Sequence, residues 1–186
     1  MLGVTRPIGA RQLPINQRRI LIVGISGAGK TTLGLRLAAI LRIPFFEVDS
    51  LFYGPNWTRR EDFPAKVAEI AGQERWIVDS FGYCEVQSVL APKADLILWL
   101  DYSRALVMRR VLSRSLRRAL RGEVRRDGNV ERFRDWLRAD FPVRWAWQHH
   151  HDRRRFFLNF LRDYASQGKV IRLRTPSQAE CWVIGR

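Results

Sequence analysis

Glycine, lysine and threonine gather near the start of the chain in the run GISGAGKTT, residues 24–32. The run fits the pattern G-x-x-x-x-G-K-[ST]. It also has the structural context that this motif requires, since it follows an apolar stretch and opens a helical pattern. Glycines let the backbone turn tightly with its N–H groups pointing inward, and the start of a helix adds partial positive charge. Lys30 is spaced to reach the β- and γ-phosphates of a nucleoside triphosphate, and Thr31 to ligate Mg²⁺. The residues predicted to hold the triphosphate are Gly24, Ser26, Gly27, Ala28, Gly29, Lys30, Thr31 and Thr32.

Acidic residues follow three apolar runs that are typical of buried strands: Asp49, Asp79 and Asp101. In parallel sheets ligands gather at the carboxyl ends of the strands, so these acids are expected near the glycine run. We interpret Asp79 as a second Mg²⁺ ligand and Asp49 as the group that orients or deprotonates an acceptor hydroxyl. The alternative for each is a helix cap or turn, and capping is the role expected of Asp101 or Ser103.

A helix rich in arginine is predicted over residues 103–121. Arg110, Arg114 and Arg118 are spaced about one helical turn apart, so they share one face of the helix, opposite an apolar face. Like charges at this spacing repel by roughly a few tenths of a kcal/mol per pair, which a bound anion would relieve. We interpret these arginines as catalytic groups that neutralise a transferring phosphoryl group, and we expect a lid around residues 114–130. The alternative is a solvated basic face.

Apolar runs alternate with helical patterns along the whole chain. Strands are predicted over residues 19–24, 43–49, 75–79, 95–101 and 169–173. Helices are predicted over residues 31–41, 59–73, 103–121, 130–141, 142–166 and 177–184. Strands separated by helices need crossover connections, so the sequence predicts an α/β fold with a parallel sheet. We expect a single domain over residues 19–186, preceded by a loose extension over residues 1–18.

The formal net charge of +15 bears on the partners of the chain. Only four of the 33 basic residues are lysine, and a basic field favours phosphates, nucleic acid or an acidic membrane surface. The two cysteines, Cys84 and Cys181, imply neither a disulfide framework nor a zinc site. The cysteine usage indicates a cytoplasmic protein. No apolar run approaches the ~20 residues of a membrane span, so we expect no membrane partner. We expect a monomer or homodimer.

Four stretches together resemble the adenylate-kinase-like P-loop proteins known as DNA topology modulation proteins: RILIVGISGAGKTTL, IPFFEVDSLFYGPNW, RWIVDSFGY and ADLILWLDYSRALVMRRVLSRSLRR. Their order and spacing match over residues 19–174. The resemblance implies a three-layer P-loop NTPase fold, with helices on both faces of a five-stranded parallel sheet in the order 2-3-1-4-5 and an Arg-rich lid. It also implies ATP and Mg²⁺ as cofactors, and it places Arg174, after the last strand, beside the adenine base.

The chain departs from that family after the third strand. The family continues with Asp-Gly-Asn-Tyr and an arginine some residues later. This chain continues with DSFGY, residues 79–83, and has no arginine between Arg75 and Arg104. An acceptor that carries an anion would therefore lack that arginine as a partner here.

The leading hypothesis is an ATP-dependent kinase that moves the γ-phosphate of ATP to a small hydroxyl- or phosphate-bearing acceptor, such as a nucleoside, a nucleotide or another metabolite. A GTPase is disfavoured because the chain lacks N-K-x-D. Phe52 and Trp57 are candidates to stack on the acceptor. One alternative is a nucleic-acid-binding ATPase or regulator that uses the basic helices, and another is a nucleotide sensor with little chemistry. Nucleic acid is not favoured, because no helix-turn-helix, zinc-finger or RNP signature is present.

Overall fold

The computed structural model describes residues 17–54, 58–80, 82–121 and 142–185, with all their side chains except those of 118–121 and 142–146. Most of the expected N-terminal extension, the expected helix over 130–141 and much of the expected lid therefore lie outside the described residues. The same holds for Trp57 and for the side chain of Arg118.

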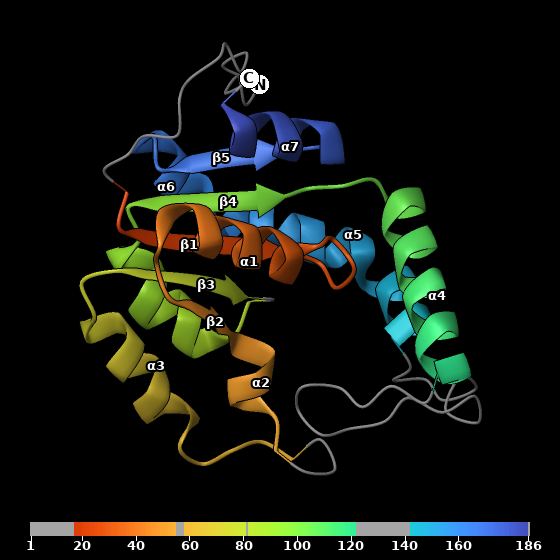
Figure 1. Ribbon diagram of the computed structural model, residues 1–186, viewed down its shortest axis with the longest axis horizontal. Helices are drawn as coiled ribbons and strands as arrows, with labels where there is room; N and C mark the ends of the chain where they lie inside the picture. Colours follow the sequence, from red (N-terminus) through yellow and green to blue (C-terminus); the bar gives the residue numbers. More distant parts are fainter. Residues whose placement is uncertain (1–16, 55–57, 81, 122–141, 186) are drawn as a thin grey trace.

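Five parallel strands form one sheet in the order β2-β3-β1-β4-β5, which confirms the predicted architecture (Figure 1). The strands are β1 (Arg19–Gly24), β2 (Phe45–Glu47), β3 (Trp76–Ser80), β4 (Leu96–Leu100) and β5 (Val170–Leu173). The central strand β1 pairs Ile22 with Asp79 of β3 on one side and with Leu98 of β4 on the other. The loop that follows β1 is therefore flanked by the carboxyl ends of both neighbouring strands.

Helices connect these strands and cover both faces of the sheet (Figure 1). They are α1 (Lys30–Leu41), α2 (Val48–Phe52), α3 (Phe63–Gly72), a π-helix η2 (Val86–Leu90), a 3₁₀ helix η3 (Ala91–Lys93), α4 (Arg104–Arg121), α5 (Pro142–Phe160), α6 (Arg162–Ser166) and α7 (Pro176–Ile184). None of the described helices is both long and apolar enough to cross a membrane.

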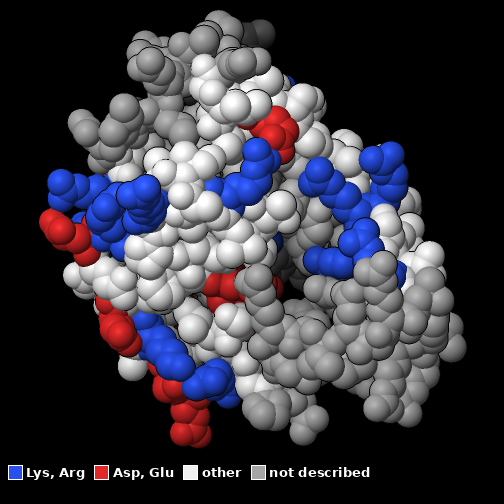
Figure 2. Space-filling view, viewed as in Figure 1, with Lys and Arg blue, Asp and Glu red and all other residues white. Residues whose placement is uncertain are grey.

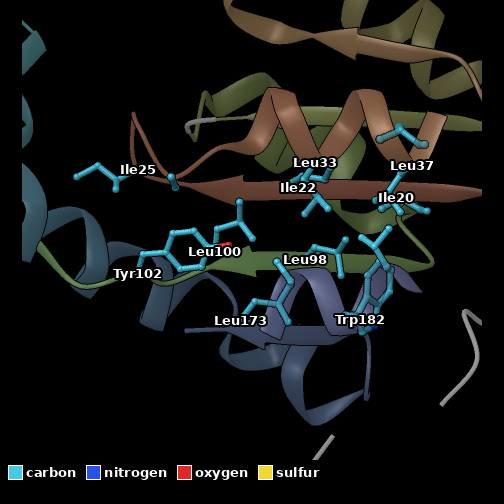
Figure 3. Close-up of a cluster of buried hydrophobic side chains, with 14 of the residues drawn as sticks. Ile20, Ile22, Ile25, Leu33, Leu37, Leu98, Leu100, Tyr102, Leu173 and Trp182 are labelled. Carbon is cyan, nitrogen blue, oxygen red and sulfur yellow. The ribbon is translucent and has the colours of Figure 1, made fainter. Parts of the chain in front are cut away.

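The core lies in two layers, one on each face of the sheet. Successive strand residues point to opposite faces, so Ile20 and Ile22 pack beneath α1 and α7, where Trp182 lies (Figure 3). Leu21 and Val23 pack on the other face, against α3 and α5. Burial on both faces explains why β1 and β4 are continuous apolar runs rather than alternating ones.

Helix α1 packs on the sheet through a glycine as well as through large apolar residues. Leu33 and Leu37 are buried, whereas Ile40 is 52% exposed. The inner face instead includes Gly34, where a Cβ atom would lie 2.2 Å from Cε2 of the Phe45 ring. Only glycine lets the ring of β2 approach the helix so closely.

The second strand ends earlier than the sequence predicted. β2 ends at Glu47, and Asp49 lies in the first turn of α2. The Oδ1 atom of Asp79 accepts a hydrogen bond from the Val48 amide at 3.3 Å, which holds the chain where it leaves the strand. The prediction that Asp49 ends a strand is therefore wrong, and Glu47, in register with Asp79, takes that position.

Asp101 connects distant segments and does not cap the next helix. Its buried carboxylate accepts hydrogen bonds from Nε of Arg154 on α5 and Nε of Arg172 on β5, both at 2.9 Å. The cap of α4 is Ser103, whose Oγ accepts from the Leu106 amide at 3.4 Å. Of the two expected capping residues, the structure selects Ser103.

Candidate active site

A cavity of about 550 Å³ opens at the carboxyl ends of the strands, above the loop that follows β1. Its walls come from the start of α1, the segment after β2, the ends of β3 and β4, and helices α4 and α7. Eleven of the predicted site residues line it: Ser26, Gly27, Ala28, Gly29, Lys30, Thr31, Thr32, Asp49, Asp79, Arg110 and Arg114. Of the other predicted residues that the structure describes, Gly24 and Arg174 are not among those lining the cavity.

The loop holds its shape through glycines in left-handed conformations. Gly27 has φ +84° and Gly29 has φ +94°, a region that other residues rarely adopt. Gly29 caps α1 without any side-chain hydrogen bond, and the first turn of α1 contains no acidic residue. No side chain of the cap or first turn therefore neutralises the positive N-terminal end of α1, and its first N–H groups can bind a ligand. Phosphate groups bind helix N-termini in this way.

Gly24 has a packing role beside the cavity. Its φ is +154°, and a Cβ atom there would lie 2.9 Å from the Leu100 carbonyl oxygen of β4. The residue lets β1 pass close to β4 before the chain turns into the loop.

Substituting Gly27→Ala is expected to destabilise the protein by about 2–4 kcal/mol, because it adds left-handed strain to a clash with α4. A Cβ atom at this position would lie 2.4 Å from Cγ2 of Val111. Denaturant unfolding measures the change. Gly72→Ala is the matched control, since it ends α3 with no atom within 4 Å of the added Cβ. Equal unfolding midpoints for the two variants would contradict the packing described.

Thr31 and Asp79 form a pair of oxygen donors at the loop. The Thr31 hydroxyl donates to Oδ2 of Asp79 at 2.7 Å, with Oε1 of Glu47 3.5 Å from the same hydroxyl. Burial raises the pKa of the Asp79 carboxyl to about 6, an effect that the Lys30 ammonium and the Thr31 hydroxyl oppose. A hydroxyl and a poorly hydrated carboxylate side by side fit Mg²⁺, which prefers oxygen ligands.

Lys30 lies at the centre of the charged groups. Loss of hydration lowers the pKa of its ammonium, while the carboxylates of Asp79 and Asp49 oppose this shift. Its Nζ donates to the Ile25 carbonyl oxygen at 3.4 Å, within the loop itself. The ammonium group is therefore held inside the loop, where a bound phosphate would meet it.

Asp49 is oriented by Tyr83, which is not among the residues predicted from the sequence. The Tyr83 hydroxyl, from the segment after β3, donates to Oδ1 of Asp49 at 2.8 Å. Burial and the neighbouring Asp49 raise the pKa of Tyr83, so the phenol stays protonated. Phe52 packs against the Tyr83 ring with centroids 4.4 Å apart and does not line the cavity. Phe52 was predicted to contact the acceptor, whereas in the structure it packs against Tyr83.

Glu47 and Ser50 also line the cavity and were missed from the sequence. The run FFEVD holds two acids, and the prediction places the end of the strand at the second of them. The shorter strand turns both Glu47 and Asp49 toward the same space. Two acids separated by one residue after an apolar run could have indicated this arrangement.

The arginines of α4 reach the loop from the opposite wall. Nη1 of Arg110 donates to the Ala28 carbonyl oxygen at 2.9 Å, and Nη2 of Arg114 donates to Oγ of Ser26 at 3.5 Å. Figure 2 shows acidic and basic side chains on opposite sides of the central hollow. The structure thus brings Arg110 and Arg114 onto the predicted phosphate site.

The far wall comes from α7 rather than from Arg174. Arg174 is exposed, and its amide donates to Oε1 of Gln178 at 2.7 Å. The residues of α7 that line the cavity are Pro176, Ala179 and Glu180, and Glu180 pairs with Arg36 of α1. A nucleotide base near this end would therefore meet α7 first.

Comparison with known proteins gives matches among solved structures alone, since no family model and no curated protein matches the chain. Shikimate kinase from Acinetobacter baumannii in complex with shikimate is 17% identical with a TM-score of 0.58, over 89% of this chain and 88% of that one. A gluconokinase from Sinorhizobium meliloti is 16% identical with a TM-score of 0.52, over 90% and 88%. Shikimate kinase from Aquifex aeolicus is 14% identical with a TM-score of 0.51, over 89% and 91%. At such identities the likeness establishes the fold, which is the three-layer α/β fold of P-loop kinases.

Proposed function

We propose that the protein is an ATP-dependent phosphotransferase that moves the γ-phosphate of ATP to a small acceptor. The observation that carries this proposal is the content of one cavity. A phosphate loop with its lysine, an oxygen pair fit for Mg²⁺ and a separately positioned carboxylate all line the same space. Phosphoryl transfer needs positioning and charge neutralisation more than covalent chemistry, and these groups supply both.

The roles follow from position. The loop amides and Lys30 would hold the β- and γ-phosphates, and Arg110 and Arg114 would neutralise charge on the transferring group. Thr31 and Asp79 would hold Mg²⁺, which when bound offsets negative charge on phosphate oxygens. Asp49, fixed through Tyr83, would accept the proton of the acceptor hydroxyl.

Two finer assignments stay predictions. The likeness in fold to kinases named for shikimate and gluconate supports a small acceptor, while the adenylate-kinase-like subtype and the DNA topology modulation family rest on sequence resemblance. The nucleic-acid alternative would use the basic helices. Two arginines of the basic helix α4, Arg110 and Arg114, bond to the phosphate loop, which favours phosphotransfer.

The proposal is tested by incubating the protein with γ-labelled ATP, Mg²⁺ and a panel of nucleosides, nucleotides and small alcohols. A labelled product with at least one acceptor is expected, with turnover that does not require DNA. ATP turnover that depends on DNA and falls steeply with salt would instead support the alternative.

Arg114→Ala is expected to lower kcat by about 10²-fold, because a guanidinium at the phosphate site is lost. Arg117→Ala is the matched control, since Arg117 is exposed on the same helix. Steady-state kinetics of both variants make the comparison. Equal kcat values would return Arg114 to the solvated basic face.

A further inference from the structure

We propose that the phosphoryl acceptor is a neutral or cationic polyhydroxyl compound rather than one bearing a phosphate or carboxylate. This inference rests on the proposed function and names the substrate class of the same site. It follows from the residues of the cavity wall after β2, which are acidic or neutral, whereas the described basic side chains lining the cavity come from α1 and α4.

The positive charge of the cavity lies around the phosphate loop and α7. Among the residues that the structure describes, the basic side chains lining the cavity are Lys30, Arg36, Arg110 and Arg114. Lys30, Arg110 and Arg114 each donate to atoms of the loop, so a bound triphosphate would engage them. Arg36 is paired with Glu180 at the α7 end.

The acceptor end presents hydrogen-bond acceptors. Glu47, Asp49 and Ser50 line it, and they follow one another at the junction of β2 and α2. The Ser50 hydroxyl already donates to the Glu47 carbonyl oxygen at 2.7 Å, so its oxygen is left to accept. Groups of this kind bind hydroxyl or ammonium donors, and they repel phosphates and carboxylates.

Three other described cations, Arg59, Arg153 and Lys93, do not line the cavity. Arg59 pairs with Glu85, and the Arg153 guanidinium lies over the Phe156 ring at 5.6 Å from its centroid. Neither lines the cavity, and Lys93, the basic residue that follows β3, donates to a backbone carbonyl on α3. The missing arginine between Arg75 and Arg104 is therefore not replaced in the cavity by a described side chain.

Matched acceptor pairs test the inference. Adenosine with AMP, and sorbitol with gluconate, are compared by kcat/KM in the γ-labelled ATP assay, with ATP binding measured separately by calorimetry. Within each pair the neutral member is expected to be favoured by about tenfold or more, as like charges suppress the wrong partner. Preference for AMP or gluconate overturns the inference and leaves the proposed function standing. Transfer to none of the four and to no member of the wider panel, with ATP bound, overturns both.

A charge-neutral variant tests the cause. Glu47→Gln is expected to reduce the preference for the neutral member by about tenfold, because one repelling charge is removed. Glu69→Gln, an exposed acid on α3, is the matched control and should keep the wild-type preference. An unchanged preference in Glu47→Gln, with ATP still bound, would show that the acidic end does not select the acceptor.

Discussion

Lys30→Ala is expected to lower kcat by about 10³-fold or more, while the protein stays folded. The ammonium lies within the phosphate loop and is the one lysine lining the described cavity. The remaining amides can still hold phosphate, but they cannot supply a full positive charge where negative charge is transferred. The variant should still fold, because burial disfavours the charged form of this ammonium and lowers its pKa. Removing the ammonium therefore removes the free-energy cost of its lost hydration.

The measurement is steady-state phosphotransfer together with circular dichroism. Lys66→Ala is the control, because Lys66 forms an exposed ion pair with Asp62, and such pairs contribute little. Near-native turnover in Lys30→Ala would remove the loop from the catalytic site. An unfolded variant would contradict the expectation on stability.

Asp79→Asn should have opposite effects on activity and on stability. We expect kcat to fall by about 10³-fold, because the amide replaces the carboxylate that would hold Mg²⁺ beside Thr31. The hydrogen-bond acceptor for the Val48 amide is kept, since an amide oxygen can take the place of Oδ1. Phosphotransfer measured at several Mg²⁺ concentrations checks this loss, which excess Mg²⁺ should restore only in part.

The stability of the metal-free protein should rise in the same variant. The pKa of Asp79 is raised to about 6 in the folded protein, so the protonated form is favoured by folding. That contribution is fully present below the unfolded pKa and is lost as the pH rises through about 6. Asparagine does not titrate, so Asp79→Asn should gain about 2–3 kcal/mol near pH 8 and little near pH 4.

Denaturant unfolding across this pH range, without metal or nucleotide, measures the gain. The wild-type protein should lose stability relative to the variant as the pH rises from about 4 to about 7. A constant difference between the two proteins would show that Asp79 ionises in the folded state as it does in water.

The features that local sequence determines were predicted well. The loop of residues 24–32 depends on its glycines, and the five strands depend on apolar runs. Both patterns can be recognised within a short window of sequence. The sheet order came from family resemblance, because strand pairing depends on contacts between distant segments. Two of the three arginines predicted on this helix, Arg110 and Arg114, reach the cavity because helical spacing places them on one face.

The features that depend on tertiary contacts could not be predicted. β2 ends at Glu47 because its chain meets the Asp79 carboxylate, which lies 32 residues later in the sequence. Phe52 packs against Tyr83, which lies 31 residues later in the sequence. No local pattern marks these choices, since each is decided by a partner that the fold brings near.

The two arginines on Asp101 have a consequence for synthesis of the chain. Asp101 is buried in the middle of the sequence, while Arg154 and Arg172 follow 53 and 71 residues later. A nascent chain that has emerged only through α4 would have to bury this carboxylate without either guanidinium, at a cost of several kcal/mol. The sheet therefore reaches full stability only after β5 has left the ribosome.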